Sequence, residues 1–483
     1  MSIVNLPMTG GFYQSQSRPL SSQECIGLYV SIPQTQTITK SNLFGTPGLD
    51  FLADAGGVNR GSHAFMGIPY FVNGTILQRL NLTFDGIGNE VWTLVTLGTI
   101  PGEKRVIMAD NGRQLCIVIP ELDETFNAFI VEDDVLTQIS AENFAGPVSS
   151  VVFSSGFFVF TAKDGNSFFK SGLRDGNSYN ALDFQNAESD PDPIKAPIVY
   201  RNQLIIFGSE TMEGYQIVPT SSFPYLFTGA VERKGLISSS AIIEIEGLLF
   251  WLGGTTQERP QILRYDGDRP VPISTRAIET ALRSYTREEL ENSFAWNYSE
   301  DGSDFVGFTF PDTCYVYDLS TGLWHERRSV DNTGSPTTYR ISNVIEAYGF
   351  LIAADILNGN IGRLNKEVFT EYGTSIRRRV VFPPIDNDGD VTIVSGAELV
   401  CQTGVGLLPT QQGDTPEIRL SWSDDGGRTF EDPISESLGE IGDYNHRVFW
   451  NELGGFDRSR MFALDISDPV PIAFYKFEVD IDS

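Results

Sequence analysis

Short runs of alternating apolar and polar residues, separated by turn signals, recur about every 40 to 46 residues along most of the chain. Within residues 64 to 80, Asn73-Gly74 separates two apolar runs, and Asn-Gly in this setting is a strong hairpin signal. Similar turns follow at 110 to 112, 156, 164 to 166 and 201 to 203. This period is typical of propeller blades, so the sequence predicts a mostly β fold containing a β-propeller of six or seven blades.

A longer spacing separates the unit at 242 to 252 from the unit at 305 to 324, and it contains a helical pattern. Ile278, Ala281, Leu282 and Tyr285 lie at i, i+3, i+4 and i+7, which predicts one amphipathic helix. Thr286, with Glu289 three residues later, has the spacing of a capping box and predicts a second short helix. We therefore expect a short helical insertion, at about residues 274 to 295, that projects from the propeller.

The two ends of the chain lack the blade period. Residues 1 to 60 contain short strand and turn pieces and are expected to form an N-terminal arm packed along a larger body. Residues 61 to 370 are expected to form the propeller. Residues 371 to 483 are expected to form a separate β-sandwich-like domain, because they contain longer alternating strands. These strands are predicted at 391 to 401, 417 to 423, 447 to 450, 461 to 466 and 472 to 481.

The charge of the chain is strongly acidic, with 63 Asp and Glu against 34 Lys and Arg and a net charge of -29. Such a balance does not support ordinary binding to a phosphate backbone. It is compatible with simple solubility, and also with an acidic wall along which DNA slides without adhering. The N-terminus lacks a secretory signal pattern, and no apolar stretch reaches about 18 residues, so a cytoplasmic chain without membrane insertion is expected. The four scattered cysteines indicate buried free thiols.

One motif favours a competing, enzymatic interpretation. Residues 423 to 430, SDDGGRTF, match the Asp-box pattern of sialidases. An Asp-box is a structural hairpin turn, and a sialidase also needs a Tyr nucleophile, an acid carboxylate and an arginine cluster that no spacing here singles out. We therefore expect no catalytic residues, and keep a carbohydrate-binding or glycan-cleaving propeller as the alternative.

Other candidate sites are weaker. The acidic stretch from Asp386 to Asp390 departs from the EF-hand pattern and is interpreted as an acidic turn. His63, His325 and His446 show no metal-ligand spacing, and no nucleotide-binding motif is present. No cofactor or metal site is expected.

Basic residues are the only candidates for contacts with a neighbouring subunit or partner. Arg377, Arg378 and Arg379 form a run at the start of the C-terminal domain, and a strand would divide them between its two faces. We expect Arg377 and Arg379, together with Arg283 and Arg287 of the helical insertion, to be available for such contacts.

The order of several segments resembles one known family over nearly the whole chain. These segments are NLPM, ECIGLY and TPGL near the N-terminus, NRGSHAFMGIPYFVNGTILQRL from Asn59, GSETMEGYQI from Gly208, ILRYDGDRPVPISTRAIETALRSYTREEL from Ile262, and, near the C-terminus, SWSDDGGRTF, HRVFWNELGGFDRSRMFALDIS and FYKFEVDI. In this order they are similar to the packaged-DNA stabilisation proteins of short-tailed bacteriophages, which form the tail hub, or nozzle, below the portal.

The resemblance implies a structural virion protein located in the tail and assembled in the host cytoplasm. It implies a ring, usually hexameric, under the portal and adaptor rings, which closes the exit channel and retains packaged DNA until ejection. It also implies docking of a tail needle or plug and of tailspikes or fibres. Double-stranded DNA would pass through an acidic lumen without sequence-specific binding.

Overall fold

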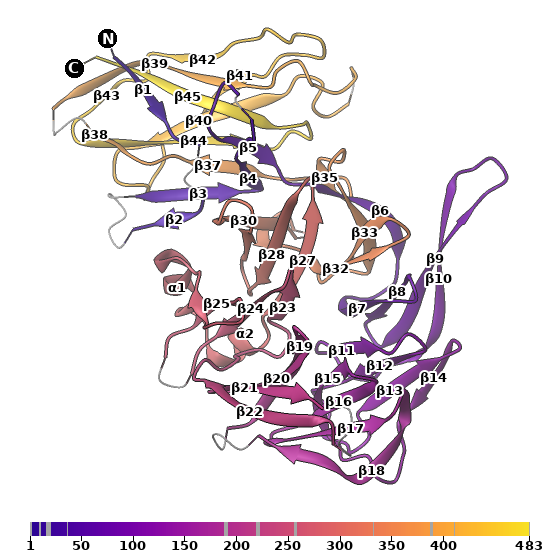
Figure 1. Cartoon of the computed structure of the whole chain (residues 1–483). Coiled ribbons are helices and arrows are strands. Elements are labelled where there is room, and N and C mark those ends of the chain that lie inside the picture. Colours follow the sequence, from indigo (N-terminus) through magenta and orange to yellow (C-terminus); the bar gives the residue numbers. More distant parts are fainter. Residues whose placement is uncertain are drawn as a thin grey trace.

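The computed structural model shows a propeller joined to a β-sandwich, and both chain termini lie on the sandwich (Figure 1). The described residues are 2–8, 11–15, 21–35, 37–187, 192–218, 223–255, 258–331, 333–386, 390–409 and 411–482. Within them the fold is almost entirely β, with two short helices. The predicted fold class, a propeller followed by a sandwich domain, is confirmed.

The described part of the propeller contains seven four-stranded units: five are separate sheets and two belong to larger sheets. Blade 1 consists of β7 (Asn59–Phe65), β8 (Ile68–Asn73), β9 (Ile76–Phe84) and β10 (Glu90–Thr99). Blade 2 consists of β11 (Ile107–Asp110), β12 (Gln114–Val118), β13 (Ala128–Glu132) and β14 (Val135–Gln138). Blade 3 consists of β15 (Val148–Ser154), β16 (Phe157–Ala162), β17 (Ser167–Gly172) and β18 (Asp175–Asn186). Blade 4 consists of β19 (Ile194–Tyr200), β20 (Gln203–Gly208), β21 (Met212–Ile217) and β22 (Tyr225–Glu232).

The remaining blades are less regular at their outer edges. Blade 5 consists of β23 (Ile242–Ile245), β24 (Leu248–Gly253), β25 (Gln261–Tyr265) and β26 (Val271–Pro272). Blade 6 consists of β27 (Phe294–Glu300), β28 (Ser303–Thr309), β29 (Cys314–Asp318) and β30 (Leu323–Val330), and the short β31 (Pro336–Thr338) pairs with β30. Blade 7 consists of β32 (Ile341–Ala347), β33 (Phe350–Asp355), β34 (Asn360–Asn365) and β6 (Gly48–Asp54), extended by β35 (Thr370–Glu371) and β36 (Thr374–Ser375).

Apolar clusters between successive blades close the ring. One cluster joins blade 3 to blade 4 through Phe168 and Tyr215, for example, and another joins blade 7 to blade 1 through Ile352 and Phe71. Each of the other blade-to-blade contacts has its own cluster. Strand β6, from the N-terminal segment, pairs with β34 and completes blade 7. The first and last parts of the propeller sequence are thereby held in one sheet, which keeps the ring from opening.

The turn signals of the sequence lie where the hairpins require them. Asn73 ends β8, and Gly74, with φ +53°, and Thr75 connect it to β9. Arg201 and Asn202 connect β19 to β20 with φ of 45° and 62°, as expected for a two-residue hairpin turn. The residue patterns that predicted these hairpins are confirmed.

Both predicted helices are present between blades 5 and 6: α1 (Arg276–Leu282) and α2 (Arg287–Glu291). The side chains of Ile278 and Leu282 are fully buried against the two blades, as the helical stripe predicts. The capping box is also confirmed, since Thr286 Oγ1 accepts from the backbone N–H of Glu289 and the Glu289 carboxylate accepts from the backbone N–H of Thr286. Because their apolar side chains are buried, these helices pack onto blades 5 and 6, whereas the sequence predicted an insertion that projects from the propeller.

Two sheets form the sandwich, and strands from both ends of the chain contribute to each. One sheet contains β1 (Ser2–Leu6), β4 (Leu28–Ser31), β5 (Asn42–Gly45), β39 (Thr392–Cys401), β42 (Val448–Asn451), β43 (Gly455–Phe456) and β45 (Ala473–Asp482). The other contains β2 (Tyr13–Gln14), β3 (Ser22–Ile26), β37 (Arg378–Val381), β38 (Ile385–Asp386), β40 (Glu417–Ser423), β41 (Ile434–Ser437) and β44 (Ser459–Ile466). The core between the sheets includes Phe382, Trp450, Phe462 and Phe477.

The N-terminal segment connects the two domains. Strand β3 pairs with β37 of the sandwich on one side and with β30 of blade 6 on the other, so one twelve-stranded sheet runs through both domains. Strands β1, β4 and β5 lie in the sandwich, and β6 lies in blade 7. The boundary near residue 370 that the sequence suggests stays a proposal, and residues 2 to 54 contribute strands to the units on both sides of it.

Candidate functional site

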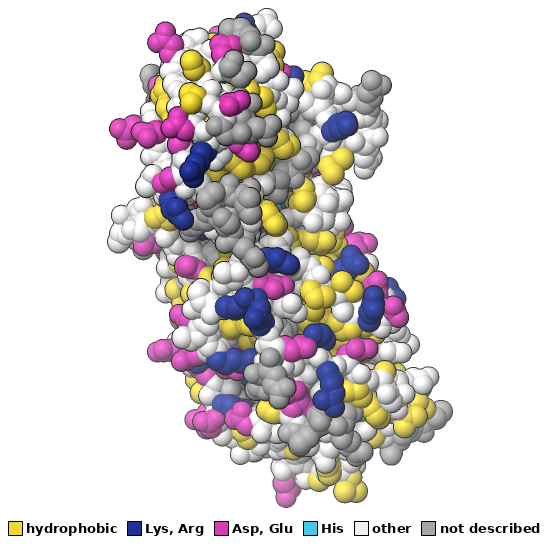
Figure 2. Space-filling view, turned by 90° about the vertical axis from the view of Figure 1, so that its left-hand side faces the viewer, with side chains coloured by type: hydrophobic (Ala, Val, Ile, Leu, Met, Phe, Trp, Pro, Cys, Tyr) yellow, Lys and Arg dark blue, Asp and Glu magenta, His cyan; other side chains and the backbone are white. Residues whose placement is uncertain are grey.

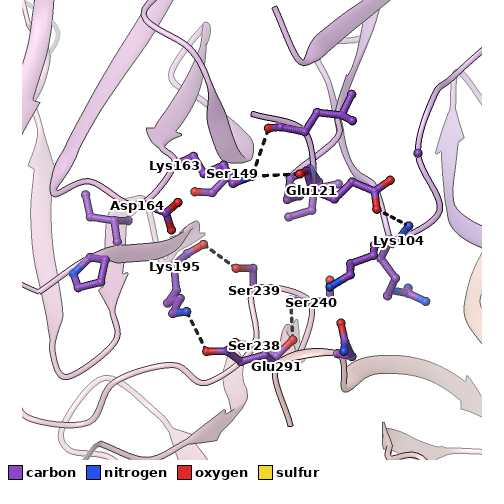
Figure 3. A pocket seen from close by; sticks show the side chains of 18 of the residues that line it. Lys104, Glu121, Ser149, Lys163, Asp164, Lys195, Ser238, Ser239, Ser240 and Glu291 are labelled. Atoms are coloured by element: carbon purple, nitrogen blue, oxygen red, sulfur yellow. Dashed lines mark hydrogen bonds and ion pairs between the residues drawn. The ribbon is translucent and has the colours of Figure 1, made fainter. Parts of the chain in front are cut away.

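A cavity of about 720 Å³ opens where the connections of blades 2 to 5 meet the end of helix α2 (Figure 3). Lys104 precedes β11, Lys163 follows β16, and Lys195 lies on β19. Ser239 precedes β23, and Glu291 ends α2. Binding and catalytic residues often lie on loops held by a rigid scaffold. This cavity, which we call the propeller mouth, is therefore the first candidate for a binding or catalytic site.

Two of the three lysines at this mouth, Lys163 and Lys195, bind oxygens of the chain itself. Lys163 Nζ donates to the backbone carbonyls of Glu121 and Leu122 at 3.1 and 3.3 Å and pairs with Asp123. Lys195 Nζ lies 3.2 Å from Glu291 Oε1 (Figure 3). These ammonium groups hold loops together, because their donors are directed at neighbouring loops.

Glu121 organises one wall of the cavity. Its carboxylate accepts from the backbone N–H of Glu103 and from that of Lys104, the latter at 3.0 Å. It also lies 3.5 Å from Nη2 of Arg60, whose side chain is 2% exposed. The guanidinium of Arg60 donates to four backbone carbonyls, at Gly74, Ile100, Pro101 and Lys104. This wall is a satisfied polar network that fixes the loop between blades 1 and 2.

The cavity does not bring together the groups of a hydrolase. Among the residues that the structure describes, its lining contains four basic side chains and four acidic ones, with neither histidine nor tyrosine. Ser238 Oγ donates to the backbone oxygen of Ser293 at 2.6 Å, and Ser239 Oγ donates to that of Lys195 at 2.8 Å, so neither hydroxyl faces a general base. Arg105 is partly buried over the ring of Phe294, with its guanidinium carbon 4.0 Å from the ring centroid, and desolvation lowers the pKa of Arg105 to about 10. The arrangement fits a cavity with equal numbers of basic and acidic side chains, whose polar groups hold the loops in place.

The Asp-box lies in the sandwich and has the role expected of a turn. Asp425 Oδ1 accepts from the backbone N–H of Arg428 at 2.8 Å and of Thr429 at 3.0 Å, and from Ser423 Oγ at 2.8 Å. Hydrogen bonds to Thr429 contribute most to holding the pKa of Asp425 below its usual range. Gly426 and Gly427 have positive φ, 78° and 80°. The structural interpretation of this motif is confirmed.

The predicted contact arginines are placed on two surfaces, and each pairs within the chain. Arg377 and Arg379 both bind the carboxylate of Asp465, and Arg379 also pairs with Glu24 at 2.9 Å. They line a cavity of about 410 Å³ together with Arg419. Arg378, on the opposite face of the strand, is fully buried.

The helical arginines form pairs one helical turn apart. Arg283 pairs with Glu279 at 3.5 Å, and Arg287 pairs with Glu291 at 3.3 Å. Their side chains are 38% and 44% exposed, so both remain accessible to a partner. Whether any of the four arginines contacts a subunit stays a prediction.

The histidines do not come together. His63 lies 2.7 Å from Asp110, His446 lies 3.0 Å from Asp443, and His325 is buried, which lowers its pKa to about 3. In the described ranges, no group of three or more His, Cys, Asp or Glu side chains could hold a metal ion. The acidic turn from Asp386 to Asp390 lies in part outside the described residues.

The four cysteines are free thiols, as the sequence predicts. Cys25, Cys116 and Cys314 are buried free thiols, and Cys401 is a partly buried one. Among the described helices, neither is long and apolar enough to cross a membrane.

The sequence did not reveal a buried charged group where the two domains meet. Glu326 on β30 is 2% exposed, and burial raises its pKa to about 7 against the opposing effect of Arg328. Its neighbours His325 and Arg327 are equally buried. The consecutive polar residues His325 to Arg328, which interrupt the alternation of a strand, were the available signal.

Comparisons with known proteins agree over both domains. The family model for the β-propeller of bacteriophage P22 Gp10 matches residues 4–369, and the model for the β-sandwich of the same protein matches residues 377–482. The tail hub protein gp10 of Salmonella phage P22 is 22% identical over 343 residues, which cover 70% of this chain and 71% of that protein.

Similarity to solved structures is low. The computationally designed Ika8 protein gives a TM-score of 0.39 at 9% identity and covers 66% of this chain and 99% of its own. An exo-β-1,3-galactanase of Phanerochaete chrysosporium gives a TM-score of 0.30 at 10% identity, with 84% and 100% covered. Both scores are too low to support an argument about activity.

Proposed function

Because the chain belongs to the family of phage P22 Gp10, whose P22 member is a tail hub protein, we propose that it forms the hub ring of a short-tailed phage, with about six copies below the portal and adaptor rings. In this position it closes the exit channel and retains packaged DNA. A tail needle or plug and tailspikes or fibres dock on the ring. The observation that carries the proposal is the match of both domains in the family order, 4–369 followed by 377–482.

Exposed apolar residues on the outer strands of the propeller support an assembled state. The hairpin of β9 and β10 extends well beyond its blade (Figure 1). Near its tip, Phe84 is 65% exposed and Ile87 is 86% exposed. On β18, Leu182 is 81% exposed and Phe184 is 54% exposed. Apolar groups in such positions are typical of surfaces that other proteins cover.

The acidic charge supports passage of DNA without adhesion. The chain has a net charge of -29, and a lumen of that sign would repel the phosphate backbone and reduce friction during exit. The face in Figure 2 carries Lys and Arg interspersed with Asp and Glu, so on this face the charge is mixed. We propose that a different, predominantly acidic surface lines the channel. A ring whose lumen is predominantly positive would exclude this part of the proposal.

The proposed role needs no catalysis and no cofactor. Lys195 and Glu291 at the propeller mouth pair with each other, and the Asp-box is a turn in the sandwich. The chain acts as a virion component of the tail that is assembled in the host cytoplasm. We also propose that Arg377, Arg379, Arg283 and Arg287 contact neighbouring subunits or partners.

Native mass spectrometry of the purified chain, alone and mixed with its portal and adaptor rings, tests the proposal. We expect saturable addition of about six copies to the portal-adaptor assembly. A chain that stays monomeric and indifferent to those rings would contradict it. Turnover of a fluorogenic sialoside or of a host-surface polysaccharide by the same preparation would instead support a glycan-cleaving propeller.

A further inference from the structure

Five buried charged side chains meet where the sandwich joins blades 6 and 7. Arg327, Arg340 and Arg378 are between 0% and 5% exposed, and Asp355 and Glu371 are 0% and 4% exposed. Arg340 pairs with Asp355 at 2.7 Å and lies 3.7 Å from Glu371. With all five groups ionised, three positive charges face two negative ones, and the less deeply buried Glu300 also interacts with Arg327.

The guanidinium of Arg378 is unpartnered within this cluster. Nε, Nη1 and Nη2 are all buried, and none has a hydrogen-bond partner among the described residues. Nη1 of Arg327 is also buried without a hydrogen-bond partner among the described residues. Nη2 of Arg327 donates to the backbone oxygen of Pro47 at 2.7 Å. Burial lowers the pKa of Arg378 to about 10, with Arg327 as a second, electrostatic cause, so the side chain stays charged at neutral pH and senses the other guanidinium.

Other buried arginines of the chain show how such groups are normally satisfied. Arg60 and Arg460 are each 2% exposed. Arg60 donates to four backbone carbonyls. Arg460 binds Asp424 through two nitrogens, at 2.7 and 2.8 Å, and donates to two backbone carbonyls as well. Arg378 lacks both kinds of partner, which is costly for a desolvated charge.

The surroundings of Arg378 come from three parts of the chain. A Cβ atom at Gly45 would lie 3.0 Å from Nε of Arg378, and one at Gly27 would lie 3.3 Å from its Cγ. The ring of Phe369 lies 6.0 Å from the guanidinium carbon. The N-terminal segment, Phe369 before β35 and Arg327 of blade 6 therefore all lie around this side chain.

We propose that Arg378 and Arg327 bind a small monovalent inorganic anion of the halide class, chloride in the cell, at the junction between sandwich and propeller. Such an anion accepts hydrogen bonds from the unpartnered nitrogens and also places a negative charge beside the two guanidinium groups, whereas a water molecule would do only the first. The site would fix the sandwich on the propeller. This inference does not depend on the proposed tail function.

Thermal unfolding at constant ionic strength, with chloride exchanged for gluconate, tests the proposal in solution. The midpoint should rise by about 1 °C for each tenfold increase in chloride above the dissociation constant. Arg378→Met should abolish the chloride-specific increment. Arg447→Met is the matched control, since Arg447 is an exposed sandwich arginine paired with Glu398, and it should retain the increment. Equal midpoints for the unaltered chain in chloride and gluconate would overturn the proposal.

Crystals of the unaltered chain soaked in bromide give a second test that does not depend on the variant folding. We expect an anomalous peak within hydrogen-bond distance of the Arg378 and Arg327 nitrogens. Water density without an anomalous signal at this place, in crystals that show bromide elsewhere, would overturn the proposal.

Discussion

The contacts between blades are mainly apolar, whereas the contact between the two domains combines aromatic packing with a cluster of buried charged side chains. Blade 3 packs on blade 4 through apolar and aromatic side chains such as Phe168, Leu204 and Tyr215. The sandwich meets blades 6 and 7 at a cluster that includes Arg327, Arg378 and Glu371. Apolar stripes tolerate small adjustments, whereas buried charges require particular partners. We infer that the blade contacts supply most of the stability and that the junction determines the orientation of the domains.

The N-terminal strands make the two regions depend on each other. Strand β3 is shared between the sandwich and blade 6, and β6 closes blade 7. Loss of either domain therefore removes pairing partners from the other. We expect the chain to unfold as one cooperative unit, despite its two kinds of core.

The largest predicted effect tests this coupling with matched core truncations. Phe477 in the sandwich and Phe168 in the propeller are both fully buried. Phe477→Ala and Phe168→Ala should each lower the free energy of unfolding by about 3 to 5 kcal/mol. Each should shift a single denaturant transition, whether it is followed by near-UV circular dichroism or by tryptophan fluorescence.

The exposed Phe84 supplies the control for these truncations, since it is 65% exposed. Phe84→Ala should change stability by less than about 0.5 kcal/mol. Two separate transitions, of which each core variant moves only one, would show that the domains unfold independently and would break the comparison.

The second effect concerns the charge that is buried at the domain junction. The pKa of Glu326 is raised from 4.5 to about 7, mainly by burial, so the folded state holds a proton that the unfolded state has released. The stabilising contribution is complete below about pH 4.5 and is lost as the pH rises through about 7. Glu326→Gln should therefore stabilise the chain by about 2 to 3 kcal/mol at pH 8 and show little of this gain at pH 4.5.

The difference between variant and unaltered chain is the quantity to measure, by urea denaturation across pH. Burial lowers the pKa of His325 from its ordinary 6.5 to about 3. Its contribution to stability is therefore complete above about pH 6.5 and is lost as the pH falls toward 3. This trend is common to both chains and cancels in the difference. Glu346→Gln, at an exposed position of β32, is the control for the Glu-to-Gln substitution itself. A pH-independent gain for Glu326→Gln would contradict the account.

A smaller effect is expected at the helical connection between blades 5 and 6. Thr286→Ala removes the capping box of α2 and should cost about 1 kcal/mol. Thr280→Ala serves as the control, because Thr280 is exposed within α1 and bonds only its own helix, at Arg276 O. A loss as large as that of a core truncation would show that α2 has a wider role in holding the blades together.

The smallest effect on stability is expected for the exposed arginines. Arg283→Ala and Arg287→Ala remove pairs one helical turn apart and should each cost less than about 0.5 kcal/mol. If these side chains contact subunits, the same variants should weaken ring assembly in native mass spectrometry. The double variant Arg377→Ala, Arg379→Ala is the corresponding test in the sandwich. Unchanged assembly in both cases would remove these arginines as subunit contacts.

Local patterns predicted the propeller well because each blade repeats the same physical requirement. Alternation and turn residues such as Asn73-Gly74 report on hairpins directly, and the stripe that includes Ile278 and Leu282 reports on a helix. The strand predicted at 417 to 423 is β40, Glu417–Ser423. Here short-range sequence and long-range packing agree.

The roles of the N-terminal strands and of the buried charges could not be predicted in this way. The pairing of β6 with β34 joins residues about 300 positions apart, and no local pattern specifies such a partner. Arg377, Arg378 and Arg379 read as one basic run, yet the middle one is fully buried and the outer two share Asp465. Burial of a charged residue depends on contacts that only the folded chain supplies.

The retention of packaged DNA is the central claim, and nuclease protection of particles tests it most directly. Particles of the phage that encodes this chain would be assembled with and without the chain, and their protected DNA would be quantified. The account predicts that heads fill in both cases but that particles without the chain lose their DNA, and that adding the purified chain during assembly restores protection. Particles that keep a full, protected genome without the chain would contradict the account.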